Sequence, residues 1–134
     1  MQGIRVMDQT DGHELGSGDI TPPSGYELLD GHSLSADAGG NIDLPFDFTG
    51  FCPDGTGHVC RGWQIELFGS AGQDLGSLVS HLPATESDCE TLGAVAPIGA
   101  GGLAYAIQNT QTGESQIVWT PSTRLNVAYP RPPN

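Results

Sequence analysis

The chain contains no lysine and only four arginines against sixteen aspartates and glutamates, so its 134 residues carry a formal net charge of -12. Binding to nucleic-acid phosphates or to anionic lipid headgroups needs positive charge, and both partner classes are therefore disfavoured. The sequence also lacks an apolar run of about 18 residues, the length that a membrane-spanning helix requires. The first residues show neither the basic nor the apolar region of a secretion signal. We expect no nucleic-acid partner, no membrane partner and no signal peptide.

Cysteine is scarce and its number is odd, with residues Cys52, Cys60 and Cys89. Three cysteines cannot all pair within one chain, so at most one internal disulfide can form. A bridge between Cys52 and Cys60 would close a short loop of turn-forming residues. The same thiols could instead stay free, or Cys52, His58 and Cys60 could bind zinc with Cys89 or His81 as the fourth ligand. The ligand spacing is not that of the usual zinc knuckle, and the three alternatives stay open.

Signatures of catalysis are also missing. There is no G-x-S-x-G motif, and the cysteine nearest to a histidine lies in acidic surroundings that do not lower a thiol pKa. Two acidic, glycine-rich segments, Asp8–Gly12 and Gly39–Asp43, resemble calcium loops only in part, so we interpret their acids as solvated turn residues. The sequence therefore predicts a protein that is not an enzyme and that needs no cofactor.

Short segments in which apolar and polar residues alternate recur along the chain, and this period of two is typical of strands. Turn-forming sequence rich in the 20 glycines separates them. The expected strands are Gly3–Asp8, Tyr26–Leu29, Asn41–Thr49, Gly62–Phe68, Ala104–Gln108, Gln116–Trp119 and Arg124–Tyr129. Seven short strands with no helix between successive strands predict an all-β fold, an antiparallel β-sandwich or small barrel with at most one or two short helices.

Several local features refine this prediction. The last three segments predict a three-stranded meander, and Pro45 should place its strand at an edge or at a bulge. Leu75–Leu82 has apolar residues at helical spacing, which indicates a helix, but it contains a glycine that weakens this interpretation. Ser87 and Glu90 have the spacing of a capping box, which predicts one helical turn over Ser87–Leu92.

The alternation also assigns side chains to faces. Trp63 and Trp119 both lie within strand patterns, so we expect both to pack in the core. Around Trp63 the pattern places Ile65 and Leu67 inward and Gln64 and Glu66 outward.

We expect the contacts with a partner to lie in two places. Phe46, Phe48 and Phe51 cluster around Pro45 in an edge-like segment and form a candidate exposed apolar contact. Residues 1–129 should form one β domain, followed over residues 130–134 by an extended arm, because its three prolines cannot join a ladder. The expected contact residues of the arm are Tyr129, Pro130, Arg131, Pro132 and Pro133.

The proline-rich arm, the start Met1–Val6 and the tandem short strands together resemble tailed-phage virion accessory proteins, such as small capsid-decoration, head-fibre-base or tail modules. The resemblance implies a structural protein that is assembled in the host cytoplasm and lies on the virion exterior. It further implies contacts with neighbouring protein subunits, homo-oligomers and arms that reach adjacent copies. The alternative is a stand-alone acidic binding module, either lectin-like or a DNA-mimic inhibitor. A lectin would need an exposed aromatic or a calcium site, and a mimic would need ordered rows of acids.

Overall fold

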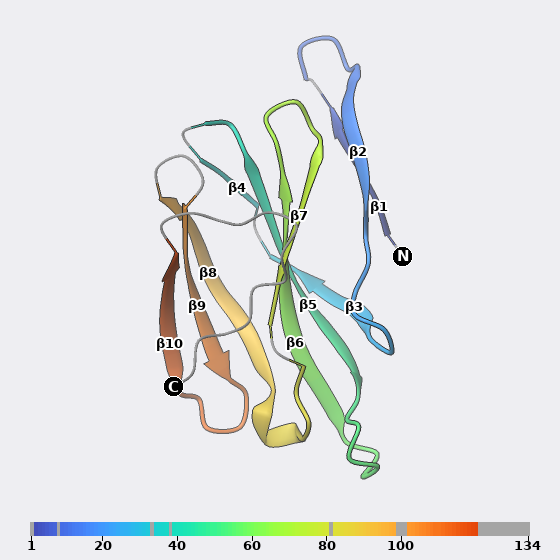
Figure 1. The fold of residues 1–134 in the computed structure, drawn as a ribbon, viewed down its shortest axis with the longest axis vertical. Helices are drawn as coiled ribbons and strands as arrows, with labels where there is room; N and C mark the ends of the chain where they lie inside the picture. Colours follow the sequence, from blue (N-terminus) through green and yellow to red (C-terminus); the bar gives the residue numbers. More distant parts are fainter. Residues whose placement is uncertain are drawn as a thin grey trace.

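The computed structural model describes residues 2–7, 9–32, 34–37, 39–80, 82–98 and 102–120, and these residues form an all-β structure (Figure 1). The elements are β1 (Gln2–Met7), β2 (Glu14–Ile20), β3 (Glu27–Gly31), β4 (Ser35–Ala36), β5 (Ile42–Phe51), β6 (Val59–Phe68), β7 (Asp74–Val79), the 3-10 helix η1 (Glu86–Asp88), β8 (Glu90–Ile98), β9 (Gly102–Asn109) and β10 (Ser115–Thr120). The predicted all-β class is confirmed, with ten strands in the described residues where the sequence predicted about seven.

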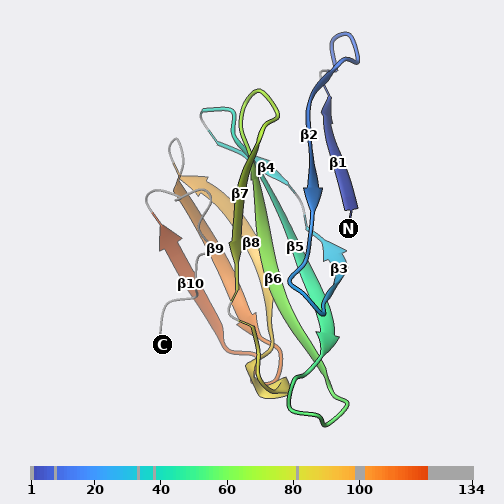
Figure 2. The same ribbon diagram turned by 45° about the vertical axis from the view of Figure 1, so that its right-hand side comes forward.

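The strands form an open sandwich rather than a closed barrel. The central sheet has the order β3-β5-β6-β7, with β4 paired to the other half of β5, and the second sheet has the order β10-β9-β8. All neighbouring strands run antiparallel. The β1-β2 hairpin forms a separate two-stranded sheet and lies on the opposite side of the central sheet from β8–β10 (Figures 1 and 2).

The main core lies between the two sheets of the sandwich. The central sheet contributes Trp63, Ile65, Leu67 and Leu78, and the second sheet contributes Leu92, Leu103, Tyr105, Ile107 and Val118. The rings of Trp63 and Tyr105 meet across the sandwich with their centres 5.0 Å apart. Each fully buried aliphatic side chain contributes about 1.5–3 kcal/mol, so this layer supplies much of the stability. The predicted core position of Trp63 is confirmed.

The opposite face of the central sheet is covered as well, which the sequence did not predict. Gln64 and Glu66 point away from the main core, as expected, yet only 3% and 5% of their surfaces are exposed. The chain that leaves β2 lies over them, since Ile20 is buried and the Thr21 carbonyl accepts a hydrogen bond from Gln64 Nε2 at 3.4 Å. In a sheet covered on both sides, the residues of a central strand are buried one after another, and β6 shows this pattern.

Pro45 lies in an internal strand whose register with β6 is unbroken, so the prediction that it lies at an edge or at a bulge is wrong. β3 pairs with one half of β5 and β4 with the other, and Pro45 lies where one gives way to the other. Its carbonyl accepts a hydrogen bond from the His32 amide at 2.9 Å. The nearest bulge is on β3, where an extra residue between Leu28 and Gly31 lies opposite Asp47, and the pairing of β3 ends at Phe46, next to Pro45. The absent amide of Pro45 therefore coincides with a gap in the ladder.

The two segments with helical signals differ from expectation. Leu75–Leu82 contributes most of strand β7, because the free edge of β6 offers a ladder and Leu78 enters the core. Near Ser87 there is only the three-residue η1, capped by Thr85 without a side-chain hydrogen bond. Glu90 already begins β8, so it pairs with β9 instead of closing a capping box. The predicted helical turn is thus shorter and begins earlier.

The meander exists, but its third strand is upstream of the predicted one. The hairpin of β9 and β10 is confirmed, with Ala104 opposite Trp119 and a turn that contains Gly113 at φ 76°. Its other neighbour is β8, which the sequence concealed because it contains Gly93 and Pro97. The predicted strand Arg124–Tyr129 lies outside the described residues.

Candidate binding surfaces

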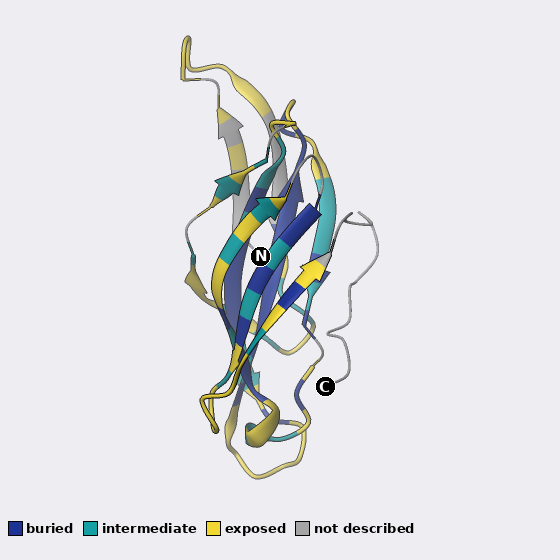
Figure 3. Cartoon of the chain, turned by 90° about the vertical axis from the view of Figure 1, so that its left-hand side faces the viewer, coloured by how far each residue is buried: buried dark blue, intermediate teal, exposed yellow. Residues whose placement is uncertain are grey.

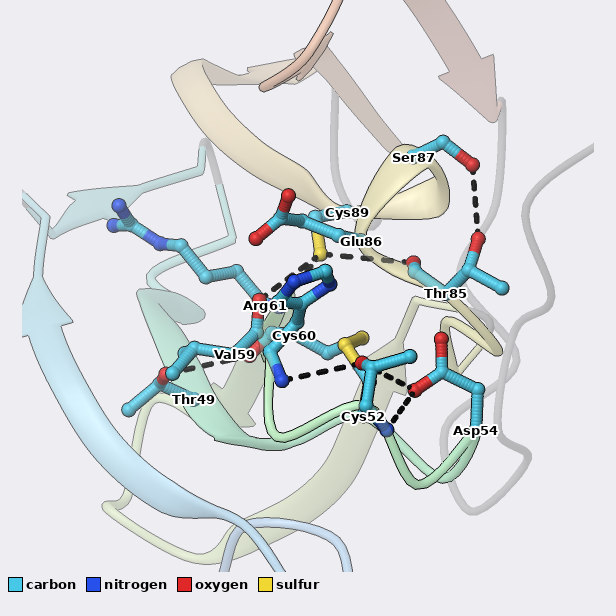
Figure 4. The surroundings of a disulfide bond; sticks show 12 residues. Thr49, Cys52, Asp54, Val59, Cys60, Arg61, Thr85, Glu86, Ser87 and Cys89 are labelled. Carbon is cyan, nitrogen blue, oxygen red and sulfur yellow. Dashed lines mark hydrogen bonds between the residues drawn. A yellow bond between two sulfur atoms is a disulfide. The ribbon is translucent and has the colours of Figure 1, made fainter.

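The cysteine-rich segment forms the tip of the β5-β6 hairpin (Figure 4). Cys52 and Cys60 are joined by a disulfide, and the amide of Cys52 donates to the carbonyl of His58 at 2.9 Å. Of the three alternatives, the disulfide is the one formed. Joined sulfurs cannot act as thiolate ligands, so the zinc alternative with Cys52, His58, Cys60 and Cys89 is not realised. His81 lies outside the described residues.

Cys89 is a free thiol buried beside this disulfide, with Tyr26 packed against the same cluster. Its Sγ accepts a hydrogen bond from the Arg61 amide at 3.1 Å (Figure 4). Burial is the main cause that raises the pKa of the Cys89 thiol. A thiol that stays protonated is a poor nucleophile, so the cluster is suited to packing rather than to cysteine chemistry.

The phenylalanine cluster predicted as a partner contact is mostly buried, so that prediction is wrong for two of its three members. Phe46 and Phe48 are 3% and 0% exposed, because they lie on the face that the chain after β2 covers. The Tyr26 ring packs edge-on against Phe48 with ring centres 5.0 Å apart. Phe51 is 76% exposed, at the tip beyond the covering layers, beside its cross-strand partner Val59. The arm residues Tyr129, Pro130, Arg131, Pro132 and Pro133 lie outside the described residues.

A buried carboxylate joins the two sheets, and no pattern in the sequence predicted it. Asp47 of β5 is 2% exposed and accepts hydrogen bonds from Thr91 Oγ1 at 2.8 Å and from the Leu92 amide at 3.3 Å, both on β8. Arg61 Nη2 and His32 Nε2 lie 3.5 and 3.2 Å from its Oδ2. Each oxygen has a polar partner, which is how a protein tolerates a buried charge. The cluster is a structural clasp between the sheets.

The acidic segments considered for calcium are turns held by their own side chains. Asp11 accepts a hydrogen bond from the His13 amide, and Asp37 accepts from the amide of Asn41 at 2.9 Å. Asp43 points inward, where burial, with a smaller contribution from the charge of Asp37, raises its pKa to about 6. It is therefore not the solvated turn acid that we expected. Within the described part of the chain, no three histidine, cysteine or acidic side chains are placed to hold a metal ion. Asp8 lies outside the described residues.

Among the described residues, the outer face of the three-stranded sheet has an apolar, uncharged patch next to the polar pair Gln108 and Ser115. We call it the Trp119 face and define it by Ala96, Ile98, Ala104, Ala106, Ile117 and Trp119. Ile117 is 73% and Trp119 is 60% exposed, so the predicted core position of Trp119 is wrong. The alternation of β10 sends Val118 into the core and its two neighbours outward, where no other described strand covers them. Figure 3 shows this sheet with its alternating burial. Alanines lie opposite both large side chains and leave them accessible.

Two hollows mark other parts of the surface. A polar hollow of about 180 Å³ at the end of β9 and β10 is lined by Asp88, Glu90, Asn109, Thr112, Glu114 and Gln116, and there Glu90 Oε1 accepts a hydrogen bond from Trp63 Nε1 at 3.3 Å. An apolar hollow of about 340 Å³ lies between β3 and β5.

No known protein family, curated protein or solved structure matches this chain. In the described residues, no helix has the length and apolar character needed to cross a membrane. Any functional assignment must therefore be built from the surfaces described above.

Proposed function

We propose that this chain is a non-enzymatic structural protein that binds neighbouring protein subunits through the Trp119 face. The single observation that carries the proposal is the exposure of Trp119 and Ile117 on a flat sheet face formed by uncharged residues. Tryptophan is among the residues most enriched at the energetic centre of protein interfaces.

The extent of the face supports an interface rather than a chance exposure. The six side chains of the Trp119 face lie on three neighbouring strands, two on each, and form one contiguous patch. Contiguous apolar patches on soluble monomers are often functional, whereas scattered apolar residues need no explanation.

The chemistry of the face also selects the partner. A charged group buried against it would lose its water and find no opposite charge, so the partner must present an uncharged apolar surface. The identical face of a second copy meets this condition and is the simplest partner. In a face-to-face pair the acidic groups of two highly negative chains would stay at the periphery, in water.

At a finer level, we propose a role on the exterior of a tailed-phage virion, as an accessory protein of the capsid or tail. The support for this level is the resemblance in layout together with the net charge of -12, which suits a surface that does not face DNA. Many weak contacts between copies then add up to stable attachment.

The test of the interface is the native mass of the purified protein, measured by analytical ultracentrifugation over a wide range of concentrations. The wild type should form dimers or larger oligomers, and a Trp119→Ser, Ile117→Ser double variant should stay monomeric. Phe51→Ser is the matched control, because it removes an equally exposed apolar side chain from another surface and should leave the mass unchanged. A wild type that is monomeric at every concentration would refute self-association.

The virion role is tested by the protein in its source material. It should migrate with large particles, and deletion of residues 131–134 should reduce its occupancy on them while leaving the domain folded. Migration as a small free protein would count against the virion role without bearing on the interface itself.

The exposed indole also favours a second candidate, carbohydrate binding, in which a sugar ring would stack on Trp119. Binding to a glycan array should then be lost in Trp119→Ser and should persist when a metal chelator is added. The absence of charged groups from the Trp119 face makes the protein partner the stronger candidate, since sugars are selected by convergent polar groups.

A further inference from the structure

The apolar hollow between β3 and β5 is a separate site, which we call the β3 socket. Its wall is formed by Ile20, Leu28, Leu29, Leu44, Pro45 and Phe46, and it has a volume of about 340 Å³. It lies on the face of the central sheet turned away from β8–β10, because Phe46 and Leu44 pair with Gln64 and Glu66 on that face.

The socket is a product of the backbone at this point. The extra residue of β3 between Leu28 and Gly31 lies opposite Asp47 and interrupts the ladder to β5, and Pro45, just beyond the last β3 pair, has no amide to donate. Bulges of this kind occur preferentially at sheet edges and beside functional sites. The gap leaves Leu29, which is 42% exposed, at the mouth of the socket.

The size and lining of the socket suit one bulky apolar side chain. An apolar cavity of about 150 Å³ lined by leucine, isoleucine and phenylalanine is large enough to bind benzene. The β3 socket has a similar lining, is more than twice that volume and is open to the surface. A phenylalanine or leucine from outside would fill it without displacing the wall.

The rim of the socket is acidic. Asp30 also lines the hollow, and its side chain is 68% exposed. The nearest described cation, Arg61 Nη2, lies 3.9 Å away, beyond hydrogen-bond length, and is closer to Asp47. Because its described ion pair with Arg61 is long and exposed, the Asp30 carboxylate can also attract a cation supplied by a partner.

β3 also offers an open edge. Among the described strands it pairs with β5 alone and is the last strand of its sheet. An extended peptide can add to such an edge through main-chain hydrogen bonds, while a neighbouring pocket selects its side chain.

We infer that the β3 socket binds an extended segment of a partner protein in which a bulky apolar residue is flanked by lysine or arginine. The inference goes beyond the proposed function, because this site lies on the other side of the sandwich from the Trp119 face and takes a charged partner segment. A chain with both sites could bridge a copy of itself to a different protein.

The test uses three blocked seven-residue peptides and the amide spectrum of the folded, isotope-labelled protein. The first peptide has phenylalanine at its centre with lysine on either side, the second replaces both lysines by glutamate, and the third replaces the phenylalanine by serine. The first should give saturable shifts of β3 and β5 amides that weaken as salt is added. The second and third should bind at least about tenfold more weakly, since each loses either the charge attraction or the buried side chain.

Variants assign the binding to the socket. Gly31→Leu should abolish the shifts, because a Cβ at this position meets no atom within 4 Å and its side chain can enter the mouth without strain. Ala71→Leu is the matched control, because it places the same side chain on the exposed turn between β6 and β7, outside both proposed binding surfaces, and it should bind like wild type. Asp30→Asn should weaken binding of the lysine peptide by about two- to fivefold and reduce its salt dependence.

Three results would overturn the inference: no saturable shift with the lysine peptide, equal binding of the lysine and glutamate peptides, or unchanged binding by Gly31→Leu. These results do not depend on self-association. A monomeric protein whose β3 socket binds the peptide would refute the proposed dimer alone, and an oligomer with an inert socket would refute this inference alone.

Discussion

The two sheets of the sandwich differ in how many of their faces are covered, and this difference governs where the protein can bind. The sheet of β8–β10 is covered on one side, so exposure alternates along β10, with Val118 buried and Trp119 exposed. The central sheet is covered on both sides, and residues 62–69 are buried without interruption. The same period-two pattern thus produced an open face in one sheet and a closed one in the other.

The comparison explains why two predictions about aromatic residues failed in opposite directions. Phe46 and Phe48 were expected at the surface and are buried, whereas Trp119 was expected in the core and is exposed. Alternation tells which side chains share a face, but a face becomes core only when a distant segment packs on it. The predictions below test that distinction.

The largest effect is expected for the two tryptophans. Trp63→Ala should lower the free energy of unfolding by about 3–5 kcal/mol, because it empties the core and leaves buried Glu90 without its indole donor. Trp119→Ala should change it by less than about 0.5 kcal/mol. Urea denaturation checks both, with Trp63→Phe as a milder variant in case Trp63→Ala does not fold. Equal losses at the two positions would contradict the assignment of covered and bare faces.

The next effect concerns the tip of the β5-β6 hairpin, where the disulfide lies in a small buried cluster with Cys89, apart from the main core. Replacing Cys52 and Cys60 by serine should cost about 2–3 kcal/mol, the entropy of closing a loop with a sequence separation of 8 residues. The measurement is urea denaturation in a Cys89→Ser background, which prevents exchange with the third thiol. Identical stability with and without the bridge would show that packing alone holds the tip.

A smaller effect is expected for substitutions at two glycines. Gly62 lies on the covered face of the central sheet, and Gly93 lies on the exposed face of the β8–β10 sheet. In Gly62→Ala the new Cβ would lie 2.4 Å from Phe48 Cζ, and the closed layer cannot give way without a shift, so a loss of about 1–3 kcal/mol follows. In Gly93→Ala the nearest atom is Ala106 Cβ at 3.4 Å, next to open solvent, and the change should stay within about 0.5 kcal/mol. Thermal denaturation of the two variants shows whether an added methyl group is tolerated on the exposed face and not on the covered one.

The smallest effect is a dependence on pH that arises from the closed face. Burial, followed by the nearby Asp74 carboxyl, raises the pKa of Glu66 to about 7, so the folded state holds a proton that the unfolded state has released. Stability from this group is complete below its ordinary pKa of 4.5 and is lost as the pH rises through about 7. The loss should be on the order of 2 kcal/mol.

Denaturation on the acidic and alkaline sides of neutrality measures this dependence. Glu66→Gln should reduce the difference in unfolding free energy between the two pH values. Asp54→Asn removes an exposed acid instead and should leave this difference unchanged. A pH profile that Glu66→Gln does not alter would assign the dependence to general charge repulsion among the acidic residues.

The sequence by itself determined the all-β class, the hairpin around Gly113 and the inward face of Trp63, and it limited the disulfides within the chain to one at most. These features depend on residues close together in the chain, where alternation, turn chemistry and short loop closure act directly. The clasp at Asp47, the burial of Phe48 and Glu66, the strand made from Leu75–Leu82 and the break beside Pro45 were decided by the tertiary structure. Each of them depends on which distant segment packs against a strand, and the local pattern of side chains contains no information about that neighbour.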